Sequence, residues 1–399
     1  MLLIENGDIH TPAPAGRASI LACGGIIERI GAIDGDTLAK HVALERLDAS
    51  DCIVVPALID VHAHLIGGSG EQGWASQTPA IAASELVTAG ITTVVGTLGT
   101  DTTTRTMPAL LAAVKALRDE GLSAFAWTGG YDARPLTRSI RDDLILIDEL
   151  IGAGELAISD RRANELTPRD LARLATDCYI AGTLTGKAGL LHLHVGDATR
   201  RLQPLRTMVH EYDVEPSWLY ATHVERNEEL MAEAIELSRR GMAIDVDVYD
   251  EDLARWVRFH RAHGGDPDLL TASSDAAIRS PGTLLEQLVG CARDGVVSLE
   301  EALALATRNP ARILELHDRG ELARGRRADL LLLDRESLAL RSVVCGGRVM
   351  LRDGVLQFRE RFLAESNREI HLIGAKRRGN HKDEKDSSEE NSGSEAKLP

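Results

Sequence analysis

The chain has 399 residues, of which 44% are hydrophobic, so it is long enough to bury one large core and a smaller second one. A net charge of −16 with only 3% aromatic residues excludes a typical nucleic-acid-binding protein. No apolar run is long enough to span a bilayer, no signal-like N-terminus is present and the cysteines form no C-x-x-C pair, so we expect a cytoplasmic protein without a membrane partner.

Both ends of the chain are predicted to be rich in β-strands. Residues 1–55 contain short apolar runs separated by turn signals such as Asn6-Gly7-Asp8, and residues 316–365 follow the same pattern. We expect the two ends to pair into one small β-sandwich domain. Residues 366–399 are charged and poor in apolar residues, which predicts a disordered tail.

The middle of the chain, residues 56–315, alternates between strands and helices. A helix start is indicated at Thr167-Pro168, where an N-cap residue precedes proline at the first helical position. Strands are predicted at 54–62, 91–98, 122–128, 155–159, 190–196, 219–224, 242–248 and 269–275. Eight strands alternating with helices predict a (β/α)8 TIM-like barrel.

Residues that can bind metal occur along several of these strands. In His62-x-His64 both imidazoles face the same side of an extended backbone, as two ligands of one cation would. Further candidates are Glu155, His192, His194, His223 and Asp275. Each has a structural alternative, because a strand histidine is often part of the core and Asp275 could cap a helix. Jointly, they indicate a metal site at the carboxyl ends of the barrel strands.

Several motifs carry a resemblance to a known family. They are L-I-G-G-S-G-E at 65–71, G-T-L-G-T-D at 96–101, T-G-G-Y at 128–131, A-I-S-D-R-R at 157–162, H-V-G-D at 194–197, T-H-V-E-R-N at 222–227 and S-S-D at 273–275. The order H-x-H, carboxylate, His, His, Asp resembles the amidohydrolase superfamily. Over about residues 1–360 the motifs resemble the bacterial isoaspartyl (β-aspartyl) dipeptidases.

That resemblance implies a binuclear site with two Zn²⁺ ions and a bridging hydroxide. The first zinc would bind His62, His64 and Asp275, and the second would bind His194 and His223. Cobalt or manganese are alternatives at such a site.

The ligand expected to bridge the two metals departs from the family pattern. The family normally uses a carboxylated lysine, and here the corresponding position is Glu155, which is already a carboxylate. Lys187, in a glycine-flanked loop, is the alternative.

The resemblance also implies roles around the substrate. Asp275 would transfer the proton and Tyr131 would donate a hydrogen bond to the developing oxyanion. Glu71 would bind the free amine of the dipeptide, and Arg162 and Arg226 its carboxylates, with Thr100 in a minor role. The eighth loop, D-A-A-I-R-S-P-G, differs from the family, so Arg279 or Ser280 would replace its usual serine.

The expected function is therefore hydrolysis of β-aspartyl dipeptides by a homo-oligomeric enzyme. The first alternative is a related amidohydrolase that acts on another acidic amide or an N-acyl amino acid. The second is a barrel that has lost catalysis and serves as a scaffold, against which the complete set of histidines, Asp275 and Tyr131 argues.

Overall fold

The computed structural model describes residues 1–11, 13–68, 71–164, 166–248, 252–364 and 366. Met1–Glu360 form one compact unit, and Arg361–Pro399 form a second, in which α12 (Arg361–Ala364) is described. Apart from Ser366, the tail predicted at 366–399 lies outside the described residues. None of the described helices has both the length and the apolar character needed to cross a bilayer.

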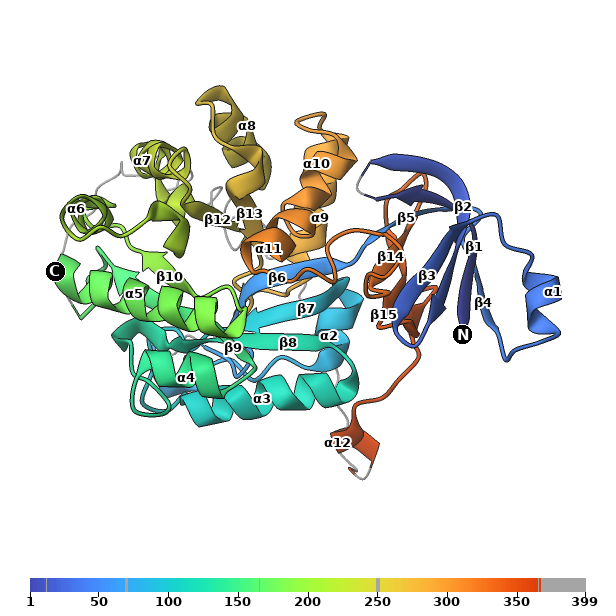
Figure 1. The fold of residues 1–399 in the computed structure, drawn as a ribbon, viewed down its shortest axis with the longest axis horizontal. Coiled ribbons are helices and arrows are strands. Elements are labelled where there is room, and N and C mark those ends of the chain that lie inside the picture. The colour runs from blue at the N-terminus through green and yellow to red at the C-terminus, as the bar shows by residue number, and fades with distance from the viewer. Residues whose placement is uncertain (12, 69–70, 165, 249–251, 365, 367–399) are drawn as a thin grey trace, which may run out of the picture. The chain divides into compact units, whose positions relative to one another are not determined.

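A parallel barrel forms the centre of the first unit (Figure 1). Its eight strands in the described residues follow chain order: β6 (Leu58–Ala63), β7 (Ile91–Gly96), β8 (Ser123–Gly129), β9 (Leu150–Ile158), β10 (Leu190–Val195), β11 (Leu219–Thr222), β12 (Ala243–Asp247) and β13 (Leu270–Ser273). The barrel closes between the end of β6 and the residues that follow β13, where Ala63 bridges Ala276 and the Asp275 amide donates to the His62 carbonyl at 3.1 Å. The predicted (β/α)8 fold is confirmed.

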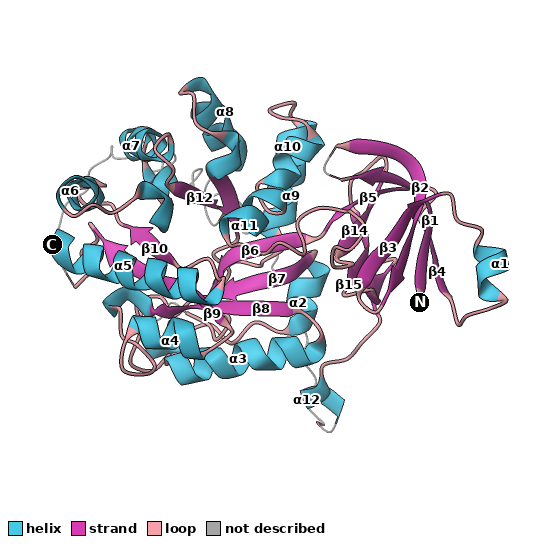
Figure 2. Ribbon diagram, in the orientation of Figure 1, coloured by secondary structure: helices cyan, strands magenta, loops and turns pink. Residues whose placement is uncertain are grey.

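Helices cover the outside of the barrel (Figure 2). They are α2 (Ala83–Thr88), α3 (Met107–Glu120), α4 (Ile140–Leu146), α5 (Pro168–Thr185), α6 (Gln203–Glu211), α7 (Glu228–Ser238), α8 (Leu253–Ala262), α9 (Thr283–Arg293), α10 (Leu299–Ala304) and α11 (Arg308–Ile313). As predicted, α5 begins after Thr167, which forms a capping box with Asp170, and it ends at the left-handed Gly186. Its buried face packs on the barrel strands.

The two chain ends meet in a second, mostly antiparallel sheet. It comprises β1 (Leu2–His10), β2 (Pro14–Cys23), β3 (Ile26–Gly31), β4 (Glu45–Asp48), β5 (Cys52–Pro56), β14 (Leu330–Asp334), β15 (Leu340–Cys345), β16 (Arg348–Arg352) and β17 (Val355–Leu356), with the short helix α1 (Gly35–Ala39) after β3. Antiparallel pairing of β5 with β14 joins the two ends. The strands predicted as a small β-sandwich form one nine-stranded sheet in the described residues, and its boundary as a domain stays a prediction.

The predicted strand at 54–62 is two strands. Residues Cys52–Pro56 belong to the antiparallel sheet, and the chain leaves it at Ala57, whose amide donates to Asp329 O at 3.1 Å. Leu58 then enters the barrel. The apolar run continues through both strands because each is buried, so hydrophobicity alone does not reveal the break.

The fourth barrel strand begins earlier than the predicted 155–159. Strand β9 starts at Leu150, and Glu155 lies within it. Gly154 has a φ of +147°, and a Cβ on it would lie 2.4 Å from the carbonyl oxygen of His192. Only glycine combines that backbone conformation with this close approach to β10. Gly154 therefore fixes the path of the strand immediately before Glu155.

We expect Gly154→Ala to lower the free energy of unfolding by about 2 kcal/mol or more, because the new methyl group would displace the backbone of β10. Chemical denaturation monitored by circular dichroism measures this. Gly290→Ala is the matched control, since Gly290 lies inside α9 with nothing within 4 Å of its added Cβ. It should leave stability unchanged or raise it by up to about 1 kcal/mol. Equal effects of the two substitutions would contradict the close-packing argument.

Candidate metal centre

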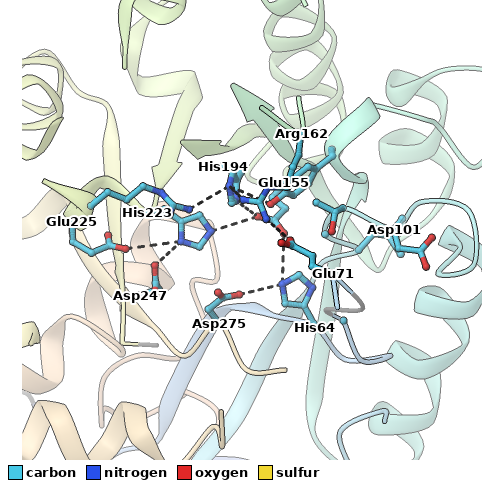
Figure 3. A pocket seen from close by; sticks show the side chains of 16 residues that line it. His64, Glu71, Asp101, Glu155, Arg162, His194, His223, Glu225, Asp247 and Asp275 are labelled. Atoms are coloured by element: carbon cyan, nitrogen blue, oxygen red, sulfur yellow. Dashed lines mark hydrogen bonds and ion pairs between the residues drawn. The ribbon is translucent and has the colours of Figure 1, made fainter. Parts of the chain in front are cut away.

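A cavity of about 390 Å³ opens beside the carboxyl ends of the barrel strands (Figure 3). His64, Glu155, His194, His223 and Asp275 line it, and Nε2 of the buried His62 lies 3.4 Å from Glu155 Oε2. The structure thus brings together all six predicted metal ligands from five strands or the residues that follow them.

Two groups of potential ligands share one residue, Glu155. The first group is His62, His64 and Glu155, and the second is Glu155, His194 and His223. Glu155 Oε2 lies 3.4 Å from His62 Nε2 and 3.0 Å from His194 Nδ1, and Glu155 Oε1 lies 3.7 Å from His64 Nε2. A carboxylate between two histidine pairs is the arrangement that a bridging ligand requires.

Asp275 joins the first group. Its Oδ1 lies 3.1 Å from His64 Nε2 and 3.4 Å from His62 Nε2. Burial raises the pKa of the Asp275 carboxyl, but His62 and His64 more than offset this and hold the pKa below its usual range. The carboxylate is therefore ionised and can accept a proton or bind a cation.

The donor atoms fit divalent cations. Among the described residues, His62 Nε2, His64 Nδ1 and Asp275 Oδ1 are buried without a hydrogen-bond partner. Leaving a buried polar atom unsatisfied costs about 1–3 kcal/mol, and a cation near these atoms would remove that cost at His62 and Asp275. Imidazole and carboxylate ligands together suit zinc, with related transition metals as alternatives.

Glu155 is suited to the bridge by its charge, and Lys187 is excluded by its position. Burial raises the pKa of Glu155, but the neighbouring imidazoles, His62 first, hold it well below its usual range. The carboxylate is thus ionised although only 1% of the residue is exposed. Lys187 instead donates to the carbonyl oxygens of Leu144 at 2.7 Å and Ile147 at 2.6 Å.

A chain of hydrogen bonds orients His62. His192 Nδ1 can donate to the Tyr220 carbonyl at 3.1 Å, and its Nε2 then accepts from His62 Nδ1 at 2.9 Å. With a cation bound, this order would leave the lone pair of His62 Nε2 for that cation. His192 also stacks on Trp127 with ring centroids 4.6 Å apart. It is therefore a core histidine that positions His62.

Two arginines and a tyrosine stand on the His194 side of the cavity. Arg162 donates to both carboxylate oxygens of Asp160, at 2.9 and 2.8 Å, and to Glu71 at 2.6 Å. Arg226 donates to the Val195 carbonyl at 2.7 Å. The Tyr131 hydroxyl lies 2.9 Å from His194 Nδ1. Burial and the Glu155 charge raise the pKa of Tyr131 well above its usual value, so it remains a hydrogen-bond donor.

The remaining predicted residues divide between the cavity and the surface. Thr100 and Glu71 line the cavity. Arg279 and Ser280 are exposed and lie outside its lining, so the structure does not bring the eighth-loop cation to the site.

Three acidic residues of the site were not among the predicted ligands or substrate contacts. Asp160 is bound to Arg162 and His194, while Asp247 and Glu225 contact His223. Asp245-x-Asp247 on β12 has the same two-residue spacing as His62-x-His64, so strand periodicity was an available signal.

Comparison with known proteins agrees with this geometry. A family model described as the amidohydrolase family matches residues 231–349. Two structures of a β-aspartyl dipeptidase from Fervidobacterium islandicum AW-1, one in complex with β-Asp-Leu, are 31–32% identical and superpose with TM-scores of 0.83 and 0.85. In both, the match covers 90% of this chain and 98% of the other.

More distant matches are also found. Adenine deaminase 2 of Rhizobium johnstonii is 25% identical over 339 residues, which are 79% of this chain. The chain spans about half of that protein, 51% of its length. The atrazine chlorohydrolase TrzN from Arthrobacter aurescens TC1, whose structure contains zinc, is 18% identical with a TM-score of 0.61 over 91% of this chain and 98% of that one. At that identity the likeness concerns the fold.

We expect Glu155→Gln to lose at least one bound cation, because a neutral amide is a poor bridge between two metals. Lys187→Met is the control and should keep the wild-type cation content. Elemental analysis of the purified proteins after dialysis measures this. Added bicarbonate should not change the cation content of either variant, since Glu155 is already a carboxylate and needs no carboxylation. A full cation content in Glu155→Gln would place the bridge elsewhere.

Proposed function

The chain belongs to the β-aspartyl dipeptidases of the amidohydrolase superfamily, and we propose that it hydrolyses β-aspartyl dipeptides with two zinc ions bound per chain. The observation that carries the proposal is Glu155, buried between two histidine pairs, with Arg162, Arg226 and Glu71 on the wall of the same cavity.

Zinc would be held by His62, His64, Glu155 and Asp275 at one position and by Glu155, His194 and His223 at the other. When bound, the two ions would lower the pKa of a bound water molecule, so that it can act as the nucleophile, and would polarise the scissile carbonyl. Asp275 is ionised and lines the cavity, so it can take up a proton and return it to the leaving amine.

Tyr131 supplies a neutral donor for the developing oxyanion. Its hydroxyl lies 2.9 Å from His194 Nδ1, and the guanidinium carbon of Arg162 lies 5.7 Å from the centre of the Tyr131 ring. Because the phenol stays protonated, it can donate to negative charge that appears only in the transition state.

The charged walls of the cavity match the free ends of the substrate. A β-aspartyl dipeptide has one ammonium group and two carboxylates. Glu71 offers an anion for the amine, and Arg162 and Arg226 offer forked donors for the carboxylates, with Thr100 nearby. In the free protein Arg162 binds Glu71, so substrate binding would replace this pair with contacts to the substrate's own opposite charges.

Hydrolysis of another acidic amide is the second candidate. The eighth loop, residues 275–282, favours this candidate, since Asp275 alone among these residues lines the cavity. A scaffold without catalysis is disfavoured by the complete cluster of ligands. The proposal also includes a homo-oligomer, as family resemblance implies, and a cytoplasmic location, which five cysteines without disulfides support.

We expect the enzyme to cleave β-Asp-Leu and to leave α-Asp-Leu essentially intact. Arg226→Met should lower kcat/KM for β-Asp-Leu by about tenfold or more with the cation content unchanged, because one charge-assisted contact is worth roughly 1.5–3 kcal/mol. Arg279→Met is the matched control, since Arg279 lies outside the cavity lining, and it should retain wild-type kinetics. Equal turnover of the two isomers would favour the second candidate. Loss of activity in Arg279→Met would instead indicate that the eighth loop contributes to substrate binding.

A further inference from the structure

We propose that Asp247, with Glu225 beside it, positions His223 and sets the cation affinity of the Glu155–His194–His223 group. This inference deepens the proposed function and rests on its metal centre. Figure 3 shows Asp247 and Glu225 on the side of His223 that faces away from Glu155. Asp247 ends β12, and Glu225 lies in the single turn that follows His223.

The distance between His223 and Asp247 shows whether these two residues form a hydrogen bond or a third cation site. His223, Glu225 and Asp247 could by composition bind a metal of their own. However, His223 Nδ1 lies 2.5 Å from Asp247 Oδ2. Two ligands of one zinc ion lie about 3.0–3.4 Å apart, because each bond is about 2.1 Å long. The contact is therefore a hydrogen bond, whereas the histidine nitrogens around Glu155 lie 3.0–3.7 Å from its oxygens, which leaves room for a cation bound to both.

This hydrogen bond determines which nitrogen of His223 is free. Asp247 can only accept when ionised, so His223 Nδ1 carries the proton and donates it. With a cation bound, the lone pair would therefore be on His223 Nε2, which faces Glu155 Oε2 at 3.7 Å. His223 lies beyond the end of β11 with a φ of +63°, so the strand does not hold its ring. The ring direction depends on the side-chain contact.

Glu225, beside Asp247, supports the same arrangement. Its carboxyl group is hydrogen bonded to Asp247, and its Oε1 lies 4.0 Å from His223 Nδ1. Both residues are buried, so the Asp247 carboxylate is shielded from solvent beside His223. A buried partner of a ligating histidine raises the basicity of that histidine as well as its order.

The two ligand groups differ in how much they need such support. In the first group Asp275 adds a fourth side chain, and the neutral His192 orients His62. The second group has three side chains within the described residues. One of them, His194, shares its carboxylate partner Asp160 with Arg162, which reduces the negative charge that His194 receives. The second group therefore depends more on the carboxylate behind His223.

The test is the affinity for Zn²⁺ of wild-type protein and of Asp247→Asn, prepared without metal and titrated in competition with a chelating dye. Asp245→Asn is the matched control. It removes a buried carboxylate from the same strand, where Asp245 accepts hydrogen bonds from Thr222, Thr271 and Ser273. Wild type and Asp245→Asn should bind two ions. Asp247→Asn should keep one ion at wild-type affinity and bind the other about 10- to 100-fold more weakly.

Two ions at unchanged affinity in Asp247→Asn would overturn this inference and leave the proposed function intact. Absence of zinc binding in wild type would overturn the proposed metal centre itself. A second measurement needs no variant at Asp247. In zinc-loaded wild-type protein with ¹⁵N-labelled histidine, identified by comparison with His223→Asn, His223 should carry its proton on Nδ1. A proton on Nε2 would also overturn the inference.

Discussion

The structure of the site depends on one buried carboxylate. Removing an ion from water costs several kcal/mol even after the protein relaxes, so Glu155 is stable in the barrel only where positive charge or strong donors surround it. Four imidazoles provide this setting, and the Glu155 amide is itself held by the Thr97 hydroxyl at 3.1 Å. Two divalent cations would meet the same need more completely. Side chains from or just after β6, β10 and β11 thus surround the one negative charge that β9 contributes.

Barrel closure brings the eighth strand to that charge. Asp60 accepts a hydrogen bond from the Ser274 hydroxyl at 2.5 Å and another from the Ser274 amide at 3.1 Å. These bonds tie β6 to the residue immediately before Asp275. Burial raises the pKa of Asp60 to about 6, although its Ser274 donors favour the charged form. The first and last strands are therefore joined by polar contacts where catalysis would need Asp275 fixed beside His62 and His64.

The sequence predicted the residues with a strong local signal. His62-x-His64 and His192-x-His194 follow the two-residue period of a strand, and apolar runs mark each strand that carries a ligand. The start of β9 was missed because Gly152 and Gly154 interrupt its apolar run, although close packing requires both glycines. The role of Asp247 could not be predicted in the same way, because it depends on the ring direction of a residue in a neighbouring turn. Such contacts appear only once adjacent strands are placed side by side.

The position of Glu71 bears on how a dipeptide would be distinguished from its isomer. Glu71 and Arg162 are joined at 2.6 Å, and their side chains are 55% and 32% exposed, so the pair contributes only about 0–1 kcal/mol and is readily exchanged. Arg162 keeps its place without Glu71 because the buried Asp160 binds it through both oxygens. A β-linked aspartyl residue carries its ammonium and carboxylate on the same carbon. In an α-linked residue the free carboxylate is one methylene farther away. If the proposed function holds, adjacent, opposite charges on the cavity wall would therefore favour the β-linked isomer.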